Sequence, residues 1–375
     1  MFFQPVLFAI SLPWTFSHPI LSVPELLKRQ DIDTTVLQFA LTLEHLENVF
    51  YQQGLKNFSQ QQFTDFGLDA NDIQNLQLIA QDEAQHVQFL TDAITAAGSQ
   101  PVAECTYSFP STDVASFLTL STVLEGVGTS AYLGGAPLLG NKDFLTAAGS
   151  ILVTEALHTS LQRAVVGAVP AANAFGTPLS ATAVFTLAAS FIVSCPDSNE
   201  PLPFTPFASL STSEQQGCDS SSSQNNQVNM TASASSTSTP AFAASTATAS
   251  NPQCSHKNTT ASTTQSSQST APYTNSTIAV AASCGALSAG APVAFTAASA
   301  IPSGSFVTFV SGLMVVSMMG QVDDVSISAT IPPSISGQSY VFVTSSDAQG
   351  KIDDAAVLFG PAILEVSLSH PDPSS

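Results

Sequence analysis

Two Glu-x-x-His motifs contain the side chains of this sequence that are best suited to bind a metal ion. They are Glu83 with His86, and Glu155 with His158. Residues three apart are neighbours on a helix face, so each motif would present a carboxylate and an imidazole to the same region. These groups suit iron or manganese, and zinc accepts the same ligands. The sequence therefore contains two candidate halves of a metal site.

Each motif lies in a segment with the apolar periodicity of a helix. Around Glu83, the apolar positions recur at steps of three and four residues: Ile73, Leu76, Ala80, Val87, Leu90 and Ile94. Gly98 follows at a typical helix end. Residues 142–167 repeat the arrangement, with Glu155 and His158 on the face that also carries Ala148, Ile151 and Gln162. Both carboxylates are therefore expected to face a core.

A third and a fourth helix are predicted from a second repeated pattern, a glutamate followed seven residues later by a tyrosine. Glu44 precedes Tyr51 in EHLENVFY, and Glu125 precedes Tyr132 in EGVGTSAY. A Glu-x6-Tyr helix thus comes before each Glu-x-x-His helix, as in a duplicated hairpin. In four-helix bundles that hold two metal ions, two helices give one glutamate each and the other two give Glu-x-x-His.

At this point the sequence resembles the secreted fungal ferritin-like proteins of the stress-response type, which are similar to plant desiccation-related proteins. The resemblance covers about residues 33–208, in the stretches LQFALTLEHLENVFY, IAQDEAQHVQFL, STVLEGVGTSAYLGGAP, TEALHTSLQ and FIVSCPDSNEPLPFTPF. It implies a ferritin-like four-helix bundle with a fifth helix, for which the apolar run at residues 177–195 is the candidate. The ligands that it implies for two divalent ions, iron or manganese, are Glu44, Glu83, His86, Glu125, Glu155 and His158.

Three further side chains are expected beside these ligands, namely Glu47, Tyr51 and Tyr132. Glu44 is preferred to Glu47 as a ligand because it has the seven-residue spacing to a tyrosine, and Glu47 is an additional or exchanging candidate on the same face. His45 points about 100° away from Glu44 on a helix and is expected at the surface or its boundary.

Charge supports a metal in this position. Four carboxylates in a bundle core would repel one another and raise each other's pKa without a cation between them. The helical region offers only Lys56, Lys142 and Arg163. Two divalent ions would supply four positive charges, which match the four glutamates.

The chain divides by composition into four segments. Residues 1–29 are an apolar leader that ends at Lys28-Arg29, as a secretory signal with a short propeptide would. Residues 30–208 are the helical domain. Residues 209–283 are rich in Ser and Thr and predict a disordered linker, either O-glycosylated or plain. Residues 284–375 contain short runs of period two, such as VSISATI, and predict a small all-β sandwich-like domain.

The cysteines and glycosylation motifs fit an exported protein. Of the five cysteines, Cys105 and Cys195 bracket the last three helical segments and are the preferred disulfide, whereas the pairing of Cys218, Cys254 and Cys284 is open. The N-glycosylation acceptors are Asn57, Asn229, Asn258 and Asn275.

Two classes of partner are excluded or disfavoured. Seven basic residues against 27 acidic ones give a net charge of -20, which excludes a nucleic-acid footprint. The chain ends in SHPDPSS without an apolar tail, so a lipid anchor at that end is not expected. We expect an extracellular or wall-associated protein that reaches the cell wall or carbohydrate through its C-terminal region, in which Met314, Met318 and Met319 are expected in the core rather than at a copper site.

Two hypotheses of function remain open. The first is an oxidoreductase whose binuclear iron or manganese site reacts with dioxygen or peroxide in stress protection. The second is a non-enzymatic stress or cell-wall protein whose metal site is structural or sequestering. A ferritin storage cage is disfavoured by the linker and glycans, and a lipid-binding interior by the inward-facing acids. The sequence gives no oligomeric state.

Overall fold

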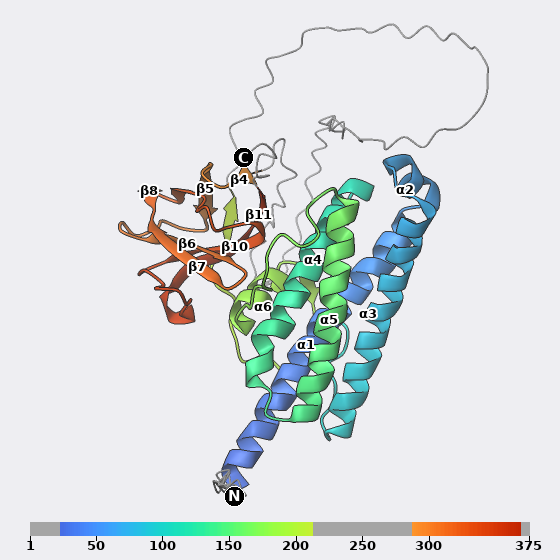
Figure 1. Cartoon of the computed structure of the whole chain (residues 1–375). Coiled ribbons are helices and arrows are strands. Elements are labelled where there is room, and N and C mark those ends of the chain that lie inside the picture. Colours follow the sequence, from blue (N-terminus) through green and yellow to red (C-terminus); the bar gives the residue numbers. More distant parts are fainter. Residues whose placement is uncertain (1–22, 213–286, 369–375) are drawn as a thin grey trace, which may run out of the picture. The chain divides into compact units, whose positions relative to one another are not determined.

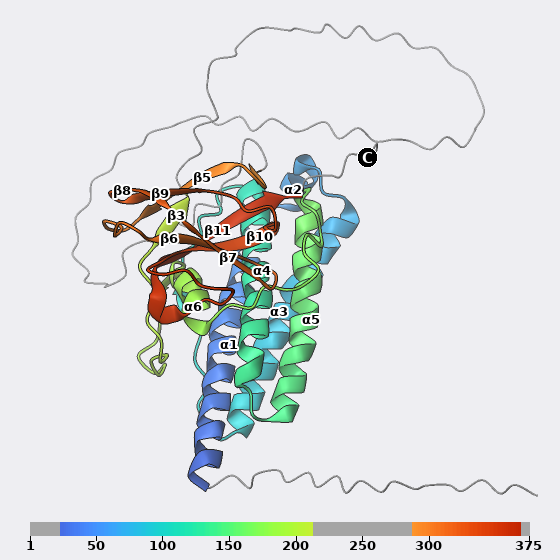
Figure 2. The ribbon, with the colours of Figure 1, turned by 60° about the vertical axis from the view of Figure 1, so that its left-hand side comes forward.

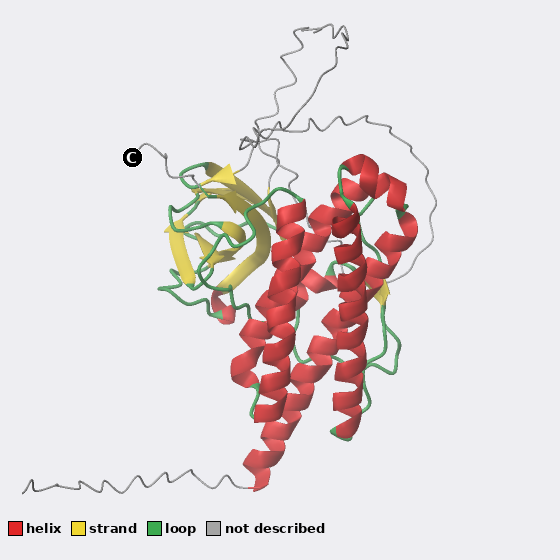
Figure 3. Ribbon diagram, turned by 45° about the vertical axis from the view of Figure 1, so that its right-hand side comes forward, coloured by secondary structure: helices red, strands yellow, loops and turns green. Residues whose placement is uncertain are grey.

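The computed structural model describes residues 23–212 and 287–368, with helices first and strands afterwards (Figure 1). This confirms the predicted fold class. The four long helices are α1 (Val23–Asn57), α3 (Ala70–Ala96), α4 (Val114–Gly135) and α5 (Lys142–Val165). α1 packs against α3, and α4 packs against α5. Figure 3 shows the long helices side by side in one bundle. The two hairpins that the repeated motifs predicted are therefore present.

Short polar side chains begin the long helices. Asp69 accepts hydrogen bonds from the first backbone N–H groups of α3, Asp113 does the same for α4 and Asn141 for α5. The short helix α2 (Gln60–Phe66) fills the connection between α1 and α3. α4 is long and apolar enough to cross a membrane, but 72% of its most apolar stretch is buried inside the structure, as in a core helix.

The fifth helix is shorter than predicted. Residues 177–195 were expected to be helical, but α6 spans only Ala181–Ala189 because Ser180, not Thr177, caps its first turn. The chain then forms β2 (Ile192–Ser194), which pairs with β1 (Thr106–Tyr107). The favoured disulfide between Cys105 and Cys195 is present beside this pair, with 4.2 Å between the two Cα atoms. The other three cysteines lie outside the described residues.

Two sheets form the C-terminal region, in the orders β4-β11-β10-β6-β7 and β3-β5-β9-β8 (Figure 2). Their strands are β3 (Leu210–Thr212), β4 (Leu287–Ser288), β5 (Pro292–Ala297), β6 (Phe306–Ser311), β7 (Met314–Met319), β8 (Gln321–Asp323), β9 (Ser326–Thr330), β10 (Gly337–Thr344) and β11 (Val357–Ser367). All pairs are antiparallel except β4 with β11. Phe295, Phe309 and Ile327 are fully buried in the core of this region.

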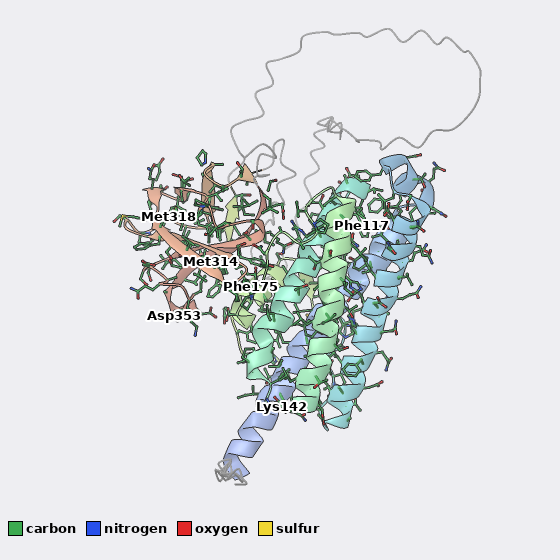
Figure 4. The ribbon with its side chains drawn as sticks, viewed as in Figure 1. Phe117, Lys142, Phe175, Met314, Met318 and Asp353 are labelled. Atoms are coloured by element: carbon green, nitrogen blue, oxygen red, sulfur yellow. A yellow bond between two sulfur atoms is a disulfide. The ribbon has the colours of Figure 1, made fainter. Side chains whose placement is uncertain are left out.

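Two expectations about this region are corrected. Leu210–Thr212 fell in the predicted linker, but they form β3, whose backbone is satisfied by β5. The methionine run forms β7, an edge strand of its sheet, and of the three methionines expected in the core only Met318 packs against it. Met314 and Met319 are 49% and 68% exposed, and no strand among the described residues pairs with that edge. Figure 4 labels Met314 and Met318 on this strand.

Strand β10 packs directly on α4. Tyr340 donates a hydrogen bond from its hydroxyl to the carbonyl oxygen of Gly126 at 3.0 Å, and Gln338 donates to the carbonyl of Val123 at 3.2 Å. A side chain at Gly126 would overlap Gln338, since an added Cβ would lie 2.5 Å from its amide. Phe342 and Tyr340 belong to the same apolar cluster as Phe117 of α4. The helical and β regions therefore share part of one core.

A salt bridge joins α5 to β11. The Arg163 guanidinium is 4% exposed and donates two hydrogen bonds to the Glu365 carboxylate, at 2.7 and 2.8 Å. A buried charge that loses its partner is strongly destabilising. This pair therefore holds the end of α5 against the sheet.

We predict that the two partners are unequal in their effect on stability. Glu365→Ala should lower the free energy of unfolding by about 2–4 kcal/mol because it leaves a buried guanidinium unpaired. Arg163→Met should cost less, because the Glu365 side chain is 44% exposed and water can solvate its charge. Urea denaturation would measure both, with Glu200→Ala on the surface as the control. Equal losses for the two variants would contradict the asymmetry.

Candidate metal centre

The six predicted ligands meet at one buried region between the four long helices. Glu44 comes from α1, Glu83 and His86 from α3, Glu125 from α4, and Glu155 and His158 from α5. All four carboxylates are fully buried, and the two histidines are 9% and 3% exposed. The sequence patterns on four separate helices thus converge as expected.

The ligand atoms fall into two groups of four. One group contains Glu44, Glu83, His86 and Glu155, and the other contains Glu83, Glu125, Glu155 and His158. Within each group the atoms lie within 4.8 Å of one another. Glu83 and Glu155 belong to both groups, so they are the two carboxylates that two ions could share.

The imidazole nitrogens have more acceptors around them than they have protons. His86 Nδ1 lies 3.3 Å from an oxygen of each of Glu44, Glu83 and Glu155. His158 Nδ1 lies 2.9 Å from Glu83 and 3.3 Å from Glu125. A single N–H cannot donate to all these oxygens. A cation bound by these groups would satisfy the nitrogen and the oxygens together.

Several oxygens of the cluster make no hydrogen bond of good geometry, although an imidazole nitrogen lies 2.9–3.3 Å from four of these oxygens. The oxygens without such a bond are Glu44 Oε2, Glu83 Oε1, Glu125 Oε2 and both carboxylate oxygens of Glu155. Unsatisfied buried oxygens of this kind are costly unless a cation coordinates them. Oxygen and imidazole donors in this number fit two divalent metal ions.

The two tyrosines hold the glutamates of the opposite helix. Tyr51 of α1 donates a hydrogen bond of 2.5 Å to Glu125 of α4, and Tyr132 of α4 donates one of 2.5 Å to Glu44 of α1. Burial, then the charge of the partner carboxylate, raises the pKa of both hydroxyls well above 10. Each phenol therefore remains a neutral donor that fixes one carboxylate oxygen and leaves the other for a metal.

The pKa is raised for several groups of the cluster. Burial, then the charge of Glu125, raises the pKa of Glu83 to about 7. Burial and neighbouring carboxylates raise the pKa of Glu155 and of Glu47 well above the usual value. Burial disfavours the charged form of His158, but Glu125 and Glu83 outweigh it and raise its pKa to about 11. The metal-free cluster therefore retains protons, which a metal would displace.

Two supporting contacts were not predicted. Asp82 faces His158 across the bundle, with 3.2 Å between its Oδ2 and Nε2 of the imidazole, which directs Nδ1 to the cluster. Gln162 donates to the hydroxyl of Tyr51 at 3.2 Å. Gln162 shares the helix face of His158, so its position could be found from the sequence, whereas the contact of Asp82 depends on how α3 and α5 pack.

Gly128 of α4 also belongs to the site. An added Cβ there would lie 2.6 Å from Glu155 Oε2 and 2.9 Å from Glu47 Oε1. The missing side chain thus allows two carboxylates to approach the helix backbone. No sequence signal separates this glycine from the others in the segment.

The remaining predicted positions lie around or outside the cluster. Glu47 is 3% exposed and lies beside Glu155 on the side of Gly128. His45 is half-buried and pairs with the backbone carbonyl of Val102, outside the cluster. Asn57 is exposed at the end of α1, and the other three glycosylation motifs lie outside the described residues.

Comparison with known proteins agrees with this geometry. Residues 32–168 match the family model of the ferritin-like domain. Protein rds1 of Schizosaccharomyces pombe is 28% identical over 180 residues, which are 48% of this chain and 44% of that protein, so the chain spans less than half of its relative. The helical region is therefore similar to the ferritin-like domain and to one fungal protein.

Two solved structures show partial likeness. The conserved hypothetical protein rv2844 of Mycobacterium tuberculosis is 19% identical, with a TM-score of 0.33, over 39% of this chain and 99% of its own. A ferritin-like, diiron-carboxylate protein of Bacillus anthracis str. Ames is 15% identical, with a TM-score of 0.32, over 37% of this chain and 97% of its own.

We predict that the stability of the metal-free protein falls as the pH rises from about 5 to 8. Folded Glu83 keeps a proton up to about pH 7, whereas the unfolded chain loses it near 4.5, and His158 behaves likewise between 6.5 and about 11. The stability from both groups is lost as pH rises through these windows, by roughly 3–5 kcal/mol between pH 5 and 8 at about 1.4 kcal/mol per pH unit for each group. Urea denaturation with a chelator would measure the slope. Glu83→Gln should flatten it, and a rise in stability over this range would contradict the prediction.

A second prediction concerns Gly128. Gly128→Ala should lower metal affinity about tenfold or more, because the methyl group displaces the carboxylates of Glu155 and Glu47. Gly149→Ala on α5 is the matched control, because an added Cβ there has no atom within 4 Å. The control should keep the metal and gain roughly 0.5–1 kcal/mol. Metal titration with circular dichroism would separate lost ligand geometry from lost fold, and unchanged affinity in Gly128→Ala would refute its role.

Proposed function

We propose that this chain, whose residues 32–168 match the ferritin-like domain family, is a secreted protein that holds two iron or manganese ions and reacts with dioxygen or peroxide in stress protection. One observation carries the proposal: two four-residue ligand groups share Glu83 and Glu155 in a fully buried cluster. A structural salt-bridge network would have no need of two overlapping groups with unsatisfied oxygens.

The ligands assign a role to each part of the chain. Glu44 and His86 would complete the first ion site, Glu125 and His158 the second, and the shared pair would bridge them. The metals would supply redox chemistry toward an oxidant. The protein's own part is to hold four carboxylates against their repulsion, orient them through Tyr51 and Tyr132, and keep bulk water out.

The negative charge of the carboxylates favours divalent cations, and so do the ligand types. Among the described residues, the ion pairs of these carboxylates are all with the two histidines. Two divalent ions neutralise four glutamates, and the raised pKa of Glu47 allows the fifth carboxyl group to stay neutral. Iron and manganese both meet these requirements.

Export is part of the proposal and rests on the sequence. The leader at residues 1–29, the glycosylation motifs and the Ser/Thr-rich segment at 209–283 are features of a secreted or wall-associated chain. Cleavage after Arg29 would leave Asp33 and all later buried residues of α1 in the mature protein. N-terminal sequencing of protein from the culture medium should begin at Gln30, and retention of the leader would oppose export.

The alternative is a non-enzymatic protein that sequesters metal or uses it for stability. Asp82, which is 40% exposed, lies beside His158 and links the cluster to the surface. An ion could enter or leave by this side. Metal loading followed by a measurement of dioxygen and peroxide consumption, described below, distinguishes this alternative from a reactive site.

We predict about two metal ions per chain. The full-length protein would be loaded with Fe²⁺ under nitrogen, or with Mn²⁺, then desalted and counted by plasma mass spectrometry. Glu83→Gln should fall below about one ion, because Glu83 serves both groups, while His158→Ala should lose roughly one. Glu104→Gln on the surface is the control and should keep two.

Reaction would be measured on the loaded wild type with dioxygen and peroxide electrodes. Consumption of more than one equivalent per site supports the oxidant chemistry. Stable binding of two ions without turnover supports sequestration instead. A wild-type protein that retains no ions would overturn the metal proposal.

A further inference from the structure

An apolar cavity of about 370 Å³ lies at one end of the helix bundle. α1, α3, α4, α5 and α6 all contribute to its wall. It occupies the end where α5 begins, at Lys142, and Figure 4 shows Phe117 toward the opposite end. Its volume lies in the range typical of small-molecule pockets, about 300–1,000 Å³.

The wall is almost entirely hydrocarbon. Among the described residues that line the cavity none is charged, and Thr35 and Tyr132 are the ones that carry a hydroxyl group. Ile32, Phe89 and Leu138 line it while remaining 47%, 47% and 53% exposed, so the apolar surface continues to the solvent. A charged ligand would lose its hydration here without compensation.

The cavity adjoins the metal centre without containing its acids. Ala40 lies four residues from Glu44 and Leu90 four residues from His86, which is about 6 Å along each helix. The direct link is Tyr132, which lines the cavity and whose hydroxyl donates to Glu44 at 2.5 Å. The acids that opposed a lipid-binding interior are thus confined to one layer, and the space beside that layer is apolar.

We propose that this cavity binds an uncharged, mostly hydrocarbon molecule of roughly a dozen non-hydrogen atoms, taking about 30 Å³ for each. The molecule lies against the ring of Tyr132, next to the carboxylate that Tyr132 orients. Its presentation to the metal ions rests on the proposed function, whereas its binding does not.

Binding is tested with the neutral fluorophore N-phenyl-1-naphthylamine and with dodecan-1-ol as competitor, on the full chain without metal. Saturable binding of about one fluorophore per chain, displaced by dodecan-1-ol, is expected. Ala93→Leu and Ala147→Leu would project into the cavity, and each should weaken binding about tenfold. Ala96→Leu, on the exposed side of the same helix as Ala93, is the matched control and should bind as the wild type does.

The link to the metal centre needs a second measurement. In protein loaded with Co²⁺, dodecan-1-ol should shift the visible absorption of the ion in the wild type, and Tyr132→Phe should reduce this shift while still binding the fluorophore. Absence of saturable fluorophore binding, or equal binding by Ala93→Leu, Ala147→Leu and the control, would overturn the cavity as a ligand site. A chain that binds the fluorophore but no metal would overturn the proposed function and leave the ligand site standing.

Discussion

The burial of five carboxylates at one level of a helix bundle is the constraint on which the rest of this structure depends. Glu44, Glu47, Glu83, Glu125 and Glu155 are at most 3% exposed, and their ion pairs within the described residues are with two histidines. Such a cluster is unfavourable unless cations or protons neutralise it. Three surrounding features are matched to this buried cluster. Phenols fix single carboxylate oxygens, imidazoles face the carboxylates, and apolar clusters keep water away on both sides.

The tyrosine pairs show how a short sequence pattern becomes a three-dimensional one. Tyr51 reaches Glu125 while Tyr132 reaches Glu44, so each Glu-x6-Tyr helix completes the other. The two residue numbers of each pair have the same sum, as antiparallel neighbours must. The same spacing on both helices therefore provides two equivalent contacts, and the metal centre inherits an approximate twofold symmetry from the duplicated hairpin.

The sequence predicted the residues whose identity depends on helical periodicity, and it missed those whose role depends on packing between distant segments. Glu83 and His86 were found because they interrupt an apolar stripe at fixed steps. Asp82 and Gly128 were not, because their contacts are to other helices. The same reason explains β3, whose partner β5 lies some 80 residues later, and the docking of Tyr340 on α4. Met314 and Met319 of β7 were misplaced because an edge strand and a core strand have the same alternation.

Two glycines within one turn of α4 leave the helix without a side chain on two sides. Gly126 admits Gln338 from the sheet, and Gly128 admits the carboxylates of Glu155 and Glu47. Glu125 precedes the two glycines and faces the cluster, and Ser130 in the next turn pairs with Tyr340 of the sheet. The sheet and the carboxylate cluster together therefore fix the direction in which each residue of this turn points. Deleting or inserting one residue here would rotate everything beyond it by about 100°, turning the sheet-facing gap and the metal-facing gap away at the same time. The number of residues in this turn is therefore fixed, even though its individual apolar residues can be exchanged.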